Sequence, residues 1–160
     1  ITTASVDVVG SSVSWGGAVI SGVQITSSNS GAISPSGSPS NVLEIESGGT
    51  SPNPVTVSFN YSIVNSGCPG CIDQIQIGLN SEASPQVCAY SGVPFPPTPV
   101  TGSPSITINV PNIPGRYYIS MDVSEDYGCQ YSSPYWANTQ PTAPQYIGVV
   151  DVWGPPAPHP

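Results

Sequence analysis

Residues 55–63, with the sequence VTVSFNYSI, decide the fold class of this chain. Apolar side chains at the odd positions from Val55 to Ile63 alternate with polar ones, which is the period of a β-strand with one buried face. Other short segments between Leu43 and Trp153 repeat this alternation, and proline and glycine fall mostly between them. No window of helical length carries an apolar stripe free of Pro and Gly. The chain is therefore predicted to be all-β.

The alternating segments predict an immunoglobulin-like β-sandwich of about seven strands over residues 41–154, followed by a Pro-rich tail at 155–160. We expect strands at residues 42–47, 54–64, 72–80, 86–91, 104–110, 116–123 and 146–153. The sequence Pro114-Gly115-Arg116-Tyr117 enters the sixth strand as a tyrosine corner does, with the phenol bonded back to the preceding connection. A tyrosine that only packs at the strand end is the alternative.

Residues 1–40 are predicted to lie outside this sandwich, as an extra N-terminal strand segment and a linker. Apolar residues alternate with polar ones at Ala4, Val6 and Val8 and again at Val13 and Trp15. A second apolar piece, 18–25, and a Ser/Gly/Pro-rich stretch, 27–40, follow them. Because the sandwich already has a full complement of strands, we expect residues 1–20 not to pair within their own subunit.

Charge is scarce, at 6 % of residues against roughly 25 % in an ordinary soluble domain. Arg116 is the one Lys or Arg residue, and the formal net charge is −8. Such a surface cannot neutralise phosphates, which argues against nucleic acid as a partner. No apolar stretch approaches the ~20 residues of a membrane span. The chain begins at Ile1 rather than Met, so we expect that a leader has been removed.

The cysteines form an even set, which together with the Ser/Thr-rich composition predicts two disulfides and a secreted, extracellular location. They are Cys68, Cys71, Cys88 and Cys129. A redox CxxC pair normally begins a helix, and a zinc site needs further ligands, whereas a strand follows Cys71. We favour pairing Cys68 with Cys129 and Cys71 with Cys88, and the swapped pairing stays open.

An enzyme is not expected, and neither is a cofactor. The one histidine, His159, lies in the proline tail, and the chain has no lysine nucleophile. Glu44 and Glu46 are predicted to point to solvent from the first strand of the sandwich. No pair of carboxylates stands out on facing strand ends, as a glycosidase would require.

Three groups of residues are candidate binding or modification sites. Asp122, Glu125 and Asp126, with Asp73 as a further candidate, offer oxygens for Ca²⁺, although a solvated acidic loop is the favoured interpretation. Aromatic side chains gather in the long loop before the last strand, at Tyr127, Tyr131, Tyr135 and Trp136. They form either a surface for sugar rings or a satellite core, and the core is favoured. Asn60, in the sequon Asn60-Tyr61-Ser62, should face outward and is a candidate for glycosylation.

Two functions fit these features. One is a structural subunit of an extracellular filament, in which an apolar strand outside a complete domain adds to a neighbour's sheet edge. Repeated head-to-tail, this contact yields a helical homopolymer. The alternative is a secreted carbohydrate-binding or adhesive module, whose ligand face would combine the loop aromatics with the amides of Gln74, Gln76 and Gln130.

The plan of an N-terminal alternating strand, a linker and a low-charge sandwich resembles donor-strand-complemented pilus and thread subunits from bacterial and archaeal cell surfaces. That resemblance implies an extracellular homopolymer in which residues near 1–20 complete a neighbour's sheet. The two disulfides depart from this plan without contradicting it.

Overall fold

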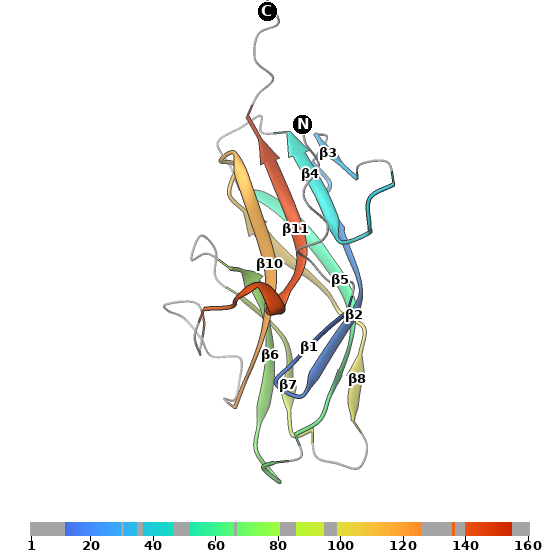
Figure 1. The fold of residues 1–160 in the computed structure, drawn as a ribbon, viewed down its shortest axis with the longest axis vertical. Coiled ribbons are helices and arrows are strands. Elements are labelled where there is room, and N and C mark those ends of the chain that lie inside the picture. The colour runs from blue at the N-terminus through green and yellow to red at the C-terminus, as the bar shows by residue number, and fades with distance from the viewer. Residues whose placement is uncertain are drawn as a thin grey trace, which may run out of the picture.

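The computed structural model describes residues 12–29, 31–34, 37–46, 52–65, 67–80, 86–94, 99–125, 136 and 140–154. Two curled sheets account for most of these residues and pack face to face (Figure 1). The described part of the chain contains one short 3₁₀ helix, η2 (Ala143–Gln145), and no helix of the length and apolarity that a membrane span requires. The all-β prediction is confirmed.

The first sheet, called sheet A, has the order β1-β2-β5, with β8 and β9 both paired to the far side of β5. Its strands are antiparallel. The bounds are β1 (Ser12–Trp15), β2 (Ala18–Thr26), β5 (Asn53–Ile63), β8 (Val100–Gly102) and β9 (Ser105–Val110).

The second sheet, sheet B, has the order β3-β4-β11-β10-β6-β7. Its neighbours are antiparallel except for the parallel pair of β4 and β11. The bounds are β3 (Ala32–Ile33), β4 (Val42–Glu46), β6 (Asp73–Leu79), β7 (Val87–Gly92), β10 (Gly115–Ser124) and β11 (Tyr146–Trp153). Each of the strands expected over residues 41–154 is present within one residue of its expected ends.

One hydrophobic core lies between the sheets and draws on both of them. Ile20 and Ile63 of sheet A, and Ile77, Ile119 and Ile147 of sheet B, are each 0 % exposed. Burying such a side chain contributes about 1.5–3 kcal/mol. The apolar face that the period-two pattern gives to every long strand therefore packs in this core and holds the two sheets together.

The expectation that residues 1–20 do not pair within their own subunit is wrong for the described residues of that segment. Strand β2 pairs with β5 from Ala18 to Thr26, and β1 pairs with β2. Ala18 and Ile20 are buried in the core because β5 would otherwise leave its inner apolar face uncovered on that side. The stretch 27–40 is also tied to the sheets, since the Ser40 carbonyl accepts a bond from Ile25 N–H at 3.0 Å.

The tyrosine corner is confirmed. The hydroxyl of Tyr117, near the start of β10, donates to the carbonyl of Ile113 at 2.7 Å. This bond ties β10 to the connection that leads from β9, and it satisfies a carbonyl in a segment with no strand partner.

Replacing Tyr117 with Phe should lower the free energy of unfolding by about 1 kcal/mol, the usual net value of one hydrogen bond. The ring keeps its packing, so the change isolates the hydroxyl bond to Ile113. Urea unfolding followed by tryptophan fluorescence measures it. An unchanged midpoint would show that water replaces the bond at no cost.

Candidate functional site

The candidate site lies at the end of the two-sheet core where the β1–β2 turn, the end of β5 and the end of β10 meet. A two-residue turn, Gly16-Gly17, joins β1 to β2, and both residues have positive φ, 61° and 85°. Such turns match the twist of a hairpin and favour glycine. The Gly17 carbonyl accepts a bond from Val64 N–H at 3.1 Å, which anchors the turn to the end of β5.

The β1–β2 hairpin presents both a strand edge and apolar side chains. Among the described residues, β1 pairs only with β2. Val13 is buried at 6 % exposure, whereas Trp15 is 40 % exposed although it lies on the same, core-side face of β1. Val19, on the opposite face of β2, is 39 % exposed. Of the predicted donor-strand residues, Ala4, Val6 and Val8 lie outside the described residues.

Beside the turn is a pocket of about 320 Å³, called the end pocket. It is lined by Gly16, Gly17, Val64, Asn65, Gly67, Asp73, Val123, Ser124 and Glu125. The Asn65 side-chain amide donates to Asp73 Oδ1 at 3.2 Å and to Glu125 Oε1 at 3.4 Å. Asp73 is 2 % exposed, and burial raises the pKa of its carboxyl, with the nearby Glu125 charge raising it further and the Asn65 hydrogen bond opposing the rise.

The predicted calcium ligands are only partly brought together. Glu125 lies with Asp73 at the end pocket, but Asp122 lies within reach of the Gln145 amide, 3.4 Å away, on the outer face of sheet B. Asp126 lies outside the described residues. Between the two carboxylates of the pocket stands the NH₂ group of Asn65, whose own oxygen accepts the N–H groups of Gly67 and Cys68. An amide donor therefore already bridges the acids where an ion would have to bind.

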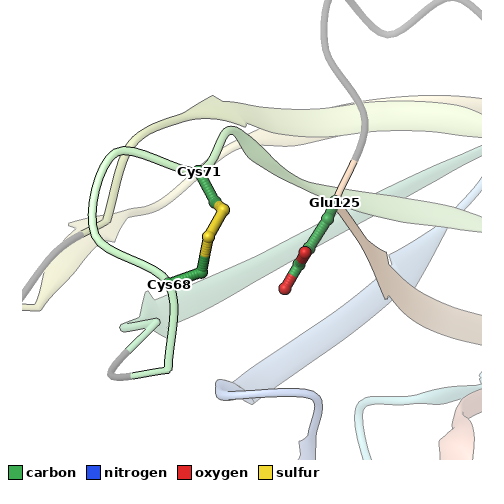
Figure 2. A group of neighbouring side chains, drawn as sticks. All are labelled: Cys68, Cys71 and Glu125. Carbon is green, nitrogen blue, oxygen red and sulfur yellow. A yellow bond between two sulfur atoms is a disulfide. The ribbon is translucent and has the colours of Figure 1, made fainter.

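The predicted disulfide pairing is wrong. Cys68 is bonded to Cys71, so the CxxC loop closes on itself instead of bridging to Cys88 or Cys129 (Figure 2). The Cα atoms are 5.4 Å apart, within the range that a disulfide spans, and Gly70 at φ 79° allows the tight turn. Glu125 extends from the end of β10 toward these sulfurs, within 4.8 Å. Bonded sulfurs offer no thiolate, so this group is not a metal site.

Cys88 is also disulfide-bonded, to a residue outside the described part of the chain. We predict that this residue is Cys129, the one cysteine left once Cys68 and Cys71 have paired. Peptide mapping of the unreduced protein should find that cross-linked peptide, and thiol titration should find no free thiol. A linkage between Cys129 and either residue of the CxxC loop would contradict the prediction.

Polar side chains on the outer face of β6 in sheet B are buried. Gln74 and Gln76 are 0 % and 1 % exposed, so they cannot form the ligand surface of the carbohydrate-binding alternative. Trp136 lies over Gly78 of β6 and donates its indole N–H to Leu79 O at 3.2 Å. Trp136 is therefore buried, as the satellite-core interpretation requires. Tyr127, Tyr131, Tyr135 and Gln130 lie outside the described residues.

Glu44 was expected to face solvent and is instead 5 % exposed. It lies directly opposite Asp151 in the parallel pairing of β4 with β11, and Asp151 in turn accepts a bond from Arg116 at 3.0 Å. Glu44 Oε1 and Asp151 Oδ2 are both buried, and neither has a hydrogen-bond partner among the described residues. Burial, reinforced by the Asp151 charge, raises the pKa of the Glu44 carboxyl above its ordinary 4.5.

Because this pKa is raised in the folded state, Glu44 stabilises the fold below pH 4.5 and loses that contribution as the pH rises through the folded value. Glu44→Gln should raise the free energy of unfolding at pH 7, because the neutral amide avoids ionising a buried carboxyl beside Asp151. The gain should vanish at pH 4. Urea unfolding at both pH values measures it, with Glu46→Gln at the exposed end of the same strand as control. A variant less stable than the parent at pH 7 would contradict the assignment.

Asn60 faces outward, as predicted, and is exposed on β5 between the buried Phe59 and the half-buried Tyr61. Its Oδ1 accepts a bond from Ser103 Oγ at 2.7 Å. Its Nδ2 lies over Gly22 of β2, where a side chain would collide with it. Whether a glycan is attached remains a prediction for mass spectrometry of native material.

No protein-family model matches this sequence, and no curated protein or solved structure is significantly similar to it. The functional argument therefore rests on the residues described above.

Proposed function

We propose that this chain is a structural subunit of an extracellular filament, assembled when an N-terminal strand of one subunit adds to a sheet edge of the next. The observation that carries the proposal is the edge of sheet A, where β1 pairs only with β2 among the described residues. The apolar alternating segment 1–9, which precedes this edge, supplies a strand of suitable pattern. Main-chain bonds along an edge, with alternate side chains in pockets, are the usual mode of such addition.

The donor strand in this proposal is residues 1–9 rather than 1–20. Val13 belongs to the chain's own core, and Trp15 lies on the same face of the same strand. Ala4, Val6 and Val8 remain as the apolar face of the donor, each contributing roughly 1.5–3 kcal/mol if fully buried. A donor and an acceptor on different surfaces of one subunit form a heterologous contact, which gives an open fibre when its rotation does not close.

The finer layout that we infer for the subunit is immunoglobulin-like. Three features support it: β5 pairs with β9 in one sheet, β10 lies between β6 and β11 in the other, and β4 runs parallel to β11. The tyrosine corner at Tyr117 is a further feature of that layout. A rigid sandwich with few charges suits a long-lived assembly, because little in its contacts varies with salt.

Particle mass tests the proposal. The full chain, at 16.4 kDa, should sediment as a broad population of much larger particles and appear as fibres by electron microscopy. The carbohydrate-binding alternative predicts a monomer that binds a glycan array. A stable monomer at micromolar concentration, with or without glycan binding, would overturn the filament proposal.

A further inference from the structure

Among the described edge strands, β7, β8 and β9 are flanked by proline and β3 is very short, whereas β1 has no proline near it. Natural sheets block their edges with proline, lysine or short strands, because an open edge recruits other chains. Here β7 lies between Pro85 and Pro94, and β9 lies directly between Pro104 and Pro111. Pro99 directly precedes β8, and β3 is only two residues long.

The edge of β1, which is four residues long, has neither proline nor charge near it in the sequence. Residues 1–34 contain no proline, and the stretch between Asp7 and Glu44 contains no charged residue. The part of β2 that extends beyond β1 is covered, because Ser40 bonds Ile25 N–H through its carbonyl and donates its hydroxyl to the Val23 carbonyl at 2.7 Å. Among the described edge strands, β1 is therefore the one with no proline close to it in the sequence.

The hydrogen-bonding groups of this edge point away from β2 at Ser12 and Ser14. In a two-residue hairpin the pair that flanks the turn, here Trp15 and Ala18, exchanges main-chain hydrogen bonds, and the next pair does not. Ser14, opposite Val19, and Ser12, opposite Ser21, are the pairs without mutual bonds. No other strand among the described residues pairs with these N–H and C=O groups.

Resting on the proposed function, we propose that this free edge of β1 is the acceptor for residues 2–9 of a second copy of the chain. An added strand beside β1 would set its apolar side chains against Val13 and the half-exposed Trp15, which lie on the core-side face. Cross-strand contacts of this kind are the unit of sheet stabilisation. The surface formed by Val13 and Trp15 is apolar and uncharged, and so is the donor's face at Val6 and Val8.

The positions of the apolar residues favour a second copy of the chain as the partner that adds to β1. Within residues 4–8 the apolar residues have even numbers, Ala4, Val6 and Val8, whereas the core-side residues of β1 have odd numbers, Val13 and Trp15. A one-residue shift moves every side chain of a strand to the other face. An unbroken extension of β1 through residues 4–8 would turn their apolar side chains away from the core, so this pattern suits a separate strand better.

Proline substitution at the edge tests the inference in the full chain. Ser14→Pro removes an outward N–H without removing a bond to β2, and Ser14→Thr is the matched control that keeps the N–H. We expect the proline variant to stay folded by circular dichroism and to lose polymerisation at least tenfold, while the threonine variant polymerises as the parent does. Mixed with the full-length donor variant Val6→Asp, the Ser14→Pro chain should form a one-to-one dimer and no fibres.

The other possible outcomes distinguish failure of the filament proposal from failure of the β1 acceptor proposal. If the parent chain forms no polymer, the proposed function fails. If the parent polymerises and Ser14→Pro polymerises equally well, the filament stands and the β1 acceptor is overturned. Ser12→Pro, at the other outward position, is the second variant. Unfolding of both proline variants would show that these N–H groups are bonded within the chain, which also overturns the acceptor.

Discussion

Removing residues 1–9 should leave a folded, soluble monomer that cannot polymerise. Everything that the described structure needs for its core begins at Ser12, because β1 starts there and Val13 is the first buried side chain. The truncated chain should keep the unfolding midpoint of the parent within the error of the measurement. Its fibre formation, followed by sedimentation and electron microscopy, should fall to nothing, since no donor strand remains.

A longer truncation is the control for this result. Removing residues 1–20 takes away β1 and the part of β2 that carries Ala18 and Ile20, both buried. Losing these side chains exposes the inner face of β5, and deletion of one large core side chain alone costs about 2–5 kcal/mol. That variant should therefore be unfolded or aggregated. Fibre formation by the chain that lacks residues 1–9 would contradict the assignment of residues 1–9 as the donor strand.

Gly17→Ala should be the most destabilising single substitution at the candidate site, at about 3 kcal/mol. A Cβ there would lie 2.4 Å from the Val64 carbonyl oxygen, and the residue has φ 85°. The left-handed conformation costs about 1–2 kcal/mol for a residue with a side chain, and overpacking against backbone adds about as much again. Chemical unfolding at pH 7 measures the loss.

Gly37→Ala separates the two contributions. Gly37 has a similar φ of 77°, but nothing lies within 4 Å of its would-be Cβ. Its substitution should therefore cost about 1 kcal/mol, the conformational part alone. Equal losses at Gly17 and Gly37 would mean that the end of β5 moves away without cost, so that the turn is not anchored as described.

The strands from β4 onward, except the three-residue β8, could be predicted from sequence because each carries a period-two apolar face between turn residues. The same reasoning placed the Tyr117 bond and the outward direction of Asn60. It did not predict that the hairpin of β1 and β2 pairs with β5, because residues 41–154 supply a full set of strands without that hairpin. Alternation shows that one face of a strand is buried, but not which sheet completes the core.

The burial of polar side chains on sheet B could not be predicted from sequence for a different reason. Alternation with apolar residues predicts a solvent-facing Glu44 and an accessible ligand face at Gln74 and Gln76, yet all three side chains are buried. Part of the cover over β6 is Trp136, which donates to the Leu79 carbonyl from a loop with no alternation of its own. Disulfide pairing likewise depends on loop paths, and strand patterns carry no information about them.

The measurement that tests the central claim most directly is a disulfide cross-link between two different chains. One chain carries Ser5→Cys, on the polar side of the donor, and the other carries Ser14→Cys, whose side chain is exposed on β1. Thr3 and Asp7 are the alternative donor positions if the register differs, and Thr107→Cys, exposed on β9, is the control. None of the described native cysteines has a free thiol to compete.

Mixed under oxidising conditions, the Ser14→Cys chain should form a two-chain species with one of the donor variants, and the Thr107→Cys chain should not. Formation of that species at Ser14 alone is the result that the account predicts. A cross-link that forms only when both cysteines lie in one chain, or equally at Thr107, would contradict it.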